Sequence, residues 1–181
     1  KMKQRFKPFI LIFLSLSILS GCGLLLKKTK SHSPAVTTTY ENKDFKLTIS
    51  YCSPSKKGRL IFGEASEKAL QPYGVYWRVG ANEATWIEFN KDISFGGKTV
   101  KAGKYALYAY PGKDQWDIVL GSKWKVWGYN EQSKKNEVTR VSITPNNDAP
   151  FLESLLVKIN EVGNLVIHWD KVEVIVPIDI L

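Results

Sequence analysis

Residues 45–52 read FKLTISYC, and this stretch indicates the fold class most directly. Apolar or aromatic residues occupy its odd positions, and polar residues or cysteine occupy its even positions. Because successive side chains of a strand point to opposite faces, this period of two predicts a half-buried β-strand. Pro54 has no backbone N–H to donate, so we expect the strand to end before it.

The chain beyond this strand repeats the pattern in short segments separated by Gly, Pro and Asn turns. In residues 85–89, Trp86 and Glu88 share one face, opposite Ile87 and Phe89. Gly96 and Gly97 have the spacing of a two-residue hairpin. We therefore expect an all-β fold, an antiparallel β-sandwich or flattened barrel of roughly nine to ten strands. The other expected strands are 93–95, 98–100, 104–110, 116–120, 138–144, 152–159, 165–169 and 172–176. Helical composition is confined to residues 64–70, which predict one short helix.

The first 21 residues predict a targeting segment rather than a part of the fold. A basic start precedes an apolar run at residues 9–19, which is shorter than the roughly 20 residues that a membrane helix needs. The tetrad from Leu19 to Cys22 resembles the signal of bacterial lipoproteins, and that resemblance implies cleavage before Cys22 and lipidation of its thiol. A buried core helix and an ordinary cleaved signal are the alternatives.

We expect the mature protein to be anchored through Cys22 to a membrane of the bacterial cell envelope, facing the periplasm or the outer membrane. Residues 22–36 predict a flexible tether, and residues 37–181 predict a single β domain of ordinary size. The expected partners are the membrane and a glycan, peptide or protein ligand. We expect a monomeric or weakly associating protein.

The formal charge of +9 is concentrated ahead of the domain. Removing the four cations that precede Cys22 leaves +5, and Lys27, Lys28 and Lys30 of the tether account for three more, so the domain carries +2. This distribution argues against a basic nucleic-acid-binding domain. The tether lysines can instead lie against anionic lipid headgroups.

Residues for catalysis or metal binding are sparse. Beyond the tether the chain has one histidine, His168, and one cysteine, Cys52. A zinc site needs three or four converging ligands, so we expect no metal and no cofactor. His168 is expected to be a satisfied sheet residue and Cys52 a buried or edge thiol. A carboxylate pair for glycoside hydrolysis stays open, with the candidates Glu64, Glu83, Glu88, Asp117 and Asp170.

Residues 76–88 combine an aromatic pair, a polar turn and a carboxylate. Trp77 could pack against a sugar ring, while Arg78, Asn82 and Glu83 could supply hydrogen bonds to a ligand. The structural alternative is a turn lock, in which Gly80 takes a positive φ, Asn82 caps the loop and Arg78 pairs with Glu83.

A second aromatic group follows the strand expected at residues 116–120. Trp124, Trp127 and Tyr129 either close one end of the sandwich or line a pocket. If they line a pocket, we expect an uncharged, flat-faced ligand such as a sugar. No catalytic residue is assigned. The candidate ligand-binding residues are Arg59, Trp77, Arg78, Asn82, Glu83, Trp124 and Trp127.

Short motifs spread through the domain carry a family resemblance. They occupy residues 51–54, 57–59, 62–63, 72–74, 77–78, 80–85, 102–105, 127–128 and 169–171. Through them the chain resembles the bacterial domain-of-unknown-function family twenty-nine eleven, most specifically over residues 77–85. The resemblance covers essentially the whole domain, and residues 65–71 look inserted. It implies a secreted or lipid-anchored protein of β fold and no established activity.

The expected function is therefore that of an envelope lipoprotein with a noncatalytic binding domain. Two alternatives remain open. One is a carboxylate-based hydrolase acting on envelope or dietary glycans, and the other is a structural or assembly lipoprotein.

Overall fold

The structure is a computed structural model that describes residues 32–126 and 130–181. Strands dominate the described residues, and two short 3-10 turns, Ala65–Glu67 and Lys134–Asn136, complete them. The all-β fold is confirmed. The strands in chain order are β1 (Ala35–Asn42), β2 (Phe45–Cys52), β3 (Phe62–Gly63), β4 (Gln71–Pro72), β5 (Trp86–Phe89), β6 (Ile93–Phe95), β7 (Lys98–Val100), β8 (Gly103–Tyr110), β9 (Trp116–Gly121), β10 (Glu137–Ile143), β11 (Leu152–Ile159), β12 (Leu165–Asp170), β13 (Val172–Val176) and β14 (Ile178–Ile180).

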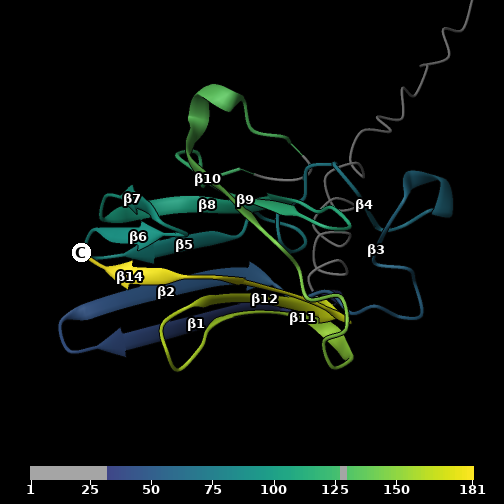
Figure 1. Ribbon diagram of the computed structural model, residues 1–181, viewed down its shortest axis with the longest axis horizontal. Helices are drawn as coiled ribbons and strands as arrows, with labels where there is room; N and C mark the ends of the chain where they lie inside the picture. The colour runs from purple at the N-terminus through teal and green to yellow at the C-terminus, as the bar shows by residue number, and fades with distance from the viewer. Residues whose placement is uncertain (1–31, 127–129) are drawn as a thin grey trace, which may run out of the picture.

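One layer of the fold is a six-stranded antiparallel sheet with the order β1-β2-β5-β8-β9-β10. We call it the main sheet. Its strands rise from β1 and β2 in the lower half of Figure 1 to β8 in the upper half. The apolar run of β8 lies between β5 and β9, within the interior of the sheet.

The second layer consists of two three-stranded sheets, β11-β12-β13 and β14-β6-β7. One apolar core joins the layers, with residues from β2, β5, β8 and β9 on one side and from β6, β11, β12 and β13 on the other. In Figure 1 the C-terminal strands accordingly lie along β1 and β2. Both layers are open sheets among the described residues, so the antiparallel sandwich is confirmed.

An aromatic cluster fills one end of this core. Trp77 stacks on Trp169 with ring centres 6.1 Å apart, and Phe62 meets Trp77, Trp116 and Trp169 edge-on. Such aromatic pairs contribute roughly 0.5–1.5 kcal/mol each beyond their buried area. Trp77 is only 2% exposed. Trp77, which was expected to contact a ligand, therefore has its indole packed inside the sandwich.

The boundaries differ from expectation in three places. Strand β1 includes residues 35 and 36 of the expected tether, and it pairs with β2 over eight residues. Its Thr-rich sequence is half exposed along an edge and so lacks a strong apolar alternation. The expected helix at residues 64–70 is a single 3-10 turn, which ends where Lys68 adopts a left-handed conformation with φ of 58°. The short strands β3, β4 and β14 were not expected.

The hairpin expected at Gly96 and Gly97 is confirmed. Gly96 and Gly97 have φ values of 56° and 83° between β6 and β7, which only glycine adopts without strain. Gly163, with φ of 90°, lies in the turn between β11 and β12. None of the helices described is long and apolar enough to cross a membrane.

Candidate functional site

The outer face of the main sheet, which points away from the core, carries a hollow of about 520 Å³. We call this hollow the aromatic pocket. Its volume lies within the range of about 300–1,000 Å³ that is usual for small-ligand sites. The lining residues used below are Ser50, Cys52, Glu83, Trp86, Trp124 and Lys125.

Strand alternation explains how the floor of the aromatic pocket forms. Leu47 and Ile49 of β2 point into the core, so Ser50 points outward. Trp86 is directly opposite Ser50 in the pairing of β2 with β5, and it faces outward in the same way. Trp86 is half-buried, and it lines the hollow together with Trp124.

Lys104 of β8 ties the two indoles together. Its ammonium lies 3.3 Å from the centre of the Trp86 ring and 4.4 Å from that of Trp124. The same nitrogen lies 3.2 Å from a carboxylate oxygen of Glu88. Cation–π contacts contribute about 0.5–1 kcal/mol at exposed sites and about 2 kcal/mol when desolvated. The Lys104 side chain is 22% exposed, so we expect an intermediate contribution that holds Trp124 over the strand.

The polar groups of the aromatic pocket are few. The thiol of Cys52 donates a hydrogen bond to Oε2 of Glu83 at 3.6 Å. Glu83 is the one carboxylate among the described lining residues, and the other candidates for a hydrolytic pair lie outside this lining. Glu88 pairs with Lys104, Asp117 with Arg140 and Asp170 with Lys56. The pocket is thus mainly apolar, with a single acidic group at its wall.

A buried hydrogen bond fixes the loop that delivers Glu83. The hydroxyl of Thr85, which is fully buried, donates to the backbone carbonyl of Val79 at 2.7 Å. Positive φ values occur at Val79 (51°) and Asn82 (58°). Gly80 itself also has a positive φ, of 158°, as expected for the turn. Gly80 is required for space as well, since a Cβ atom there would lie 3.0 Å from the Thr85 hydroxyl.

Val79 is an unusual residue to find in the left-handed region. A β-branched side chain is strained there, at a cost of about 1–3 kcal/mol. The Val79 side chain is completely buried, and the Thr85 hydrogen bond holds its carbonyl. Thr85 was not singled out from the sequence because it resembles any other strand threonine. No local pattern reveals that its hydroxyl is buried.

A second hollow, of about 370 Å³, is lined in part by Arg78, Gly80 and Ala81 of the same loop. We call it the basic hollow. Lys57, Arg59 and Arg78 line it, together with His32 and Trp169. The loop of residues 76–85 therefore contributes to two different sites. Arg78 lines the basic hollow, whereas Glu83 lines the aromatic pocket.

The structure thus separates the candidate ligand-binding residues. Arg59 and Arg78 come together in one hollow, and Glu83 and Trp124 in the other. The side-chain amide of Asn82 donates to the backbone carbonyl of Ser33 at 3.5 Å, and so connects the loop to the N-terminal segment. Trp77 is packed in the core, and Trp127 lies outside the described residues, as does the expected lipidation site Cys22.

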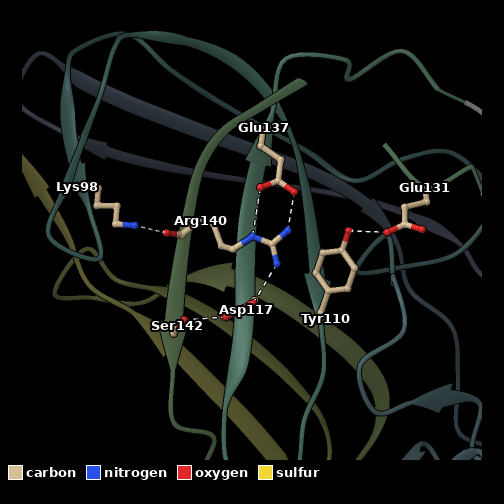
Figure 2. A network of polar contacts seen from close by, with 7 residues as sticks. All are labelled: Lys98, Tyr110, Asp117, Glu131, Glu137, Arg140 and Ser142. Carbon is tan, nitrogen blue, oxygen red and sulfur yellow. Dashed lines mark hydrogen bonds and ion pairs between the residues drawn. The ribbon is translucent and has the colours of Figure 1, made fainter. Parts of the chain in front are cut away.

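Arg140 is the centre of a polar network farther along the outer face (Figure 2). Its guanidinium binds both carboxylate oxygens of Glu137 and lies 2.9 Å from Oδ2 of Asp117. It also packs over the ring of Tyr110, whose hydroxyl donates to Glu131 at 2.8 Å. Burial and the Glu131 carboxylate raise the pKa of Tyr110 to about 12. The positive charge of Arg140 is neutralised by Glu137 and Asp117. The network therefore links β8, β9 and β10 and does not present a reactive group.

His168 is likewise satisfied within the fold. Its Nε2 atom lies 2.8 Å from the carbonyl oxygen of Pro150, and its Nδ1 atom lies 3.9 Å from Glu173. Within residues 32–126 and 130–181, no group of three His, Cys, Asp or Glu side chains is placed to hold a metal ion.

Comparison with known protein families finds a match. A family model described as "Protein of unknown function (DUF2911)" matches residues 33–178, which include both hollows apart from His32. No curated protein and no solved structure matches the chain.

Proposed function

We propose, from the premise that the chain belongs to the DUF2911 family of proteins of unknown function, that it is a noncatalytic binding protein. Its aromatic pocket would take an uncharged, flat-faced ligand, and a sugar residue of a glycan fits this description best. The observation that carries the proposal is the pair of indoles, Trp86 and Trp124, that line the same hollow.

Indole rings suit the apolar faces of sugars because they offer a large, rigid surface that loses little conformational entropy on binding. Ligand sites typically combine such surfaces with a small number of polar groups that set orientation. Glu83, Ser50 and Lys125 are placed to do this here. Lys104 holds the two indoles together, because its ammonium lies close to the centres of both rings.

The single carboxylate in the described lining favours binding over hydrolysis. Glycosidases usually require two carboxyl groups separated by roughly 5–10 Å, one acting as acid and the other as nucleophile or base. Glu83 is hydrogen-bonded to Cys52, and the neighbouring carboxylate of Glu88 is engaged by Lys104.

We also propose that the protein is held at a membrane of the cell envelope by a lipid on Cys22. The extended chain from Cys22 to Ala35 can reach at most about 45 Å. Ala35 lines the aromatic pocket, so the pocket would face ligands close to that membrane. Mass spectrometry of the mature protein tests the anchor directly, and an unmodified Cys22 would refute it.

Binding can be tested by titrating the purified protein with neutral polysaccharide and cell-wall oligosaccharides while recording tryptophan fluorescence. We expect saturable binding that Trp124→Ala weakens at least tenfold, which corresponds to about 1.4 kcal/mol. Phe151→Ala is the matched control, because Phe151 is an exposed aromatic that does not line the pocket.

Two outcomes would argue against the proposal. Failure of every oligosaccharide to bind would favour a structural or assembly role. Turnover of one oligosaccharide that Glu83→Gln abolishes, while the protein stays folded, would instead favour a hydrolase.

A further inference from the structure

We infer that the basic hollow is a second binding site, which takes the phosphate or carboxylate group of a small organic anion. The site is separate from the aromatic pocket, and the inference does not depend on the function proposed for that pocket. It rests on the charge of the hollow and on the way in which Arg59 is held.

The lining of the basic hollow is strongly one-sided in charge. Lys57, Arg59 and Arg78 contribute cations from two separate segments, and no aspartate or glutamate is among the described residues that line it. Like charges gathered around one concavity repel one another and concentrate anions from solution. A bound anion would relieve this repulsion.

Arg59 is held in place without being neutralised. Its Nε atom donates to the carbonyl oxygen of Lys56 at 2.9 Å, and Nη2 donates to that of Ser55 at 2.6 Å. These two bonds fix the plane of the guanidinium, but backbone carbonyls carry no net charge. Within the described chain, Arg59 forms no ion pair with a carboxylate. Its remaining N–H groups can therefore meet an oxyanion in the planar geometry that arginine favours.

The neighbouring Lys56 shows the contrast. Its ammonium forms an ion pair with Asp170 and lies 5.9 Å from the ring centre of Phe151. The adjacent Lys57 has its backbone N–H bound by the Glu153 carboxylate at 2.8 Å, and its exposed side chain lines the hollow. Two consecutive lysines thus have different roles. Lys56 belongs to the fold, and Lys57 faces the hollow.

Backbone strain next to Arg78 is a further sign of a functional site. Arg78 and Gly80 both line the hollow and flank Val79, whose φ is 51°. Strained residues persist where the surrounding structure enforces them, and they cluster at functional sites. The Thr85 hydrogen bond to the Val79 carbonyl provides that enforcement here.

The apolar part of the lining indicates an organic anion. Pro54, Leu70 and Trp169 form a wall beside the cations. An anionic group at Arg59 could therefore carry a short carbon skeleton that covers this apolar surface. This arrangement fits a phosphomonoester or a small carboxylate.

Titrating the full protein with inorganic phosphate and with glutarate, at constant ionic strength, tests the inference. Binding is followed by amide chemical shifts in NMR spectra. We expect at least one probe to bind saturably, and Arg59→Gln to weaken it about tenfold or more, as expected for loss of a charge-assisted hydrogen bond. Arg59→Lys should recover only part of the loss, because it keeps the charge but not the planar fork.

Lys57→Gln and Lys43→Gln form a matched pair that separates a site from general attraction. Both lysines are exposed and have positive φ values, 50° and 53°. Only Lys57 lines the hollow, because Lys43 lies in the turn between β1 and β2. We expect Lys57→Gln to weaken anion binding several-fold and Lys43→Gln to leave it unchanged.

The outcomes are distinct. Binding of phosphate alone assigns a phosphoryl ligand, and binding of glutarate alone assigns a carboxylate; both support the site. If neither phosphate nor glutarate binds, the inference is overturned. Equal losses of anion binding in the two lysine variants would overturn it as well. Trp124→Ala should leave anion binding intact, so failure of the aromatic pocket proposal would not be mistaken for failure of this one.

Discussion

The ammonium of Lys104 lies 3.3 Å from the centre of the Trp86 ring, with the Trp124 ring 4.4 Å away on the loop that follows β9. One side chain of β8 thereby joins a strand residue to a loop residue that is distant in sequence. The contact adds to the hydrogen bond that the Ala84 N–H donates to the Val126 carbonyl at 3.2 Å and to the packing of Trp124 on the cluster that includes Tyr108, which also hold this loop.

Replacing Lys104 by Met should destabilise the protein by about 1 kcal/mol, because the aliphatic stem is kept while the cation–π contacts are lost. Urea unfolding measures this change. Lys158→Met, at an exposed position of β11, is the control. Trp124 should also become more mobile, so its fluorescence anisotropy should fall. If Lys104→Met is as stable as Lys158→Met, the contact does not hold the loop.

Replacing Thr85 by Val should cost about 1–3 kcal/mol, because the buried carbonyl of Val79 loses its donor. Thr85→Ser keeps the hydroxyl and should retain most of the stability. Thr99→Val, at an exposed position of β7, should change the free energy of unfolding by less than about 0.5 kcal/mol. Equal stability of the Thr85→Val and Thr99→Val variants would show that the loop does not depend on this bond.

Asp117 should contribute to stability in a pH-dependent way. Burial raises its pKa, but hydrogen bonds from Ser142 and Arg140 outweigh burial and lower the pKa below the ordinary value of 3.8. The contribution is therefore present above about pH 3.8 and is lost as the pH falls through the folded-state pKa.

Asp117→Asn should consequently be less stable than the parent at pH 7, and the gap should close in acid. Denaturant unfolding at a series of pH values measures it, with Asp179→Asn, on the exposed face of β14, as the control. A gap that stays constant down to the acid limit would mean that the carboxylate charge is not what stabilises the network.

Tyr110 should have the opposite dependence at high pH. Its pKa is raised from 10.0 to about 12, first by burial and then by the Glu131 carboxylate. The neutral hydroxyl therefore contributes stability that is fully present below pH 10 and is lost as the pH rises through about 12. The stability difference between the parent and Tyr110→Phe should shrink across this window. A phenolate absorbance change at pH 10 that disappears in Tyr110→Phe would contradict the raised pKa.

Much of the fold follows from local pattern, because alternation in residues 45–52 and glycine pairs such as Gly96-Gly97 act over a few residues. Strand β1 could not be predicted in the same way. Its eight residues are held by pairing along the whole length of β2, and its half-exposed face provides no strong apolar signal. At Ala65–Glu67 a local signal was present but misleading. The segment of helical composition is too short to form an α-helix, and it forms a single 3-10 turn.

Several residues that line the two hollows were predicted from the sequence, but not which of them lie together. Arg78 and Glu83 are five positions apart, yet they line different hollows because the intervening backbone turns through Val79 and Asn82. Trp77 has the composition of a ligand platform, and its burial against Trp169 depends on a strand far along the chain. Such long-range contacts have no signature in a single local stretch.

The proposal that the aromatic pocket binds a sugar is tested most directly by NMR. The indole N–H resonances of the protein are followed while an oligosaccharide that binds is titrated in. Single Trp→Phe variants assign the resonances. The proposal predicts that the signals of Trp86 and Trp124 shift together and saturate, while those of the buried Trp77, Trp116 and Trp169 stay in place. Binding that leaves the Trp86 and Trp124 signals unmoved would contradict it.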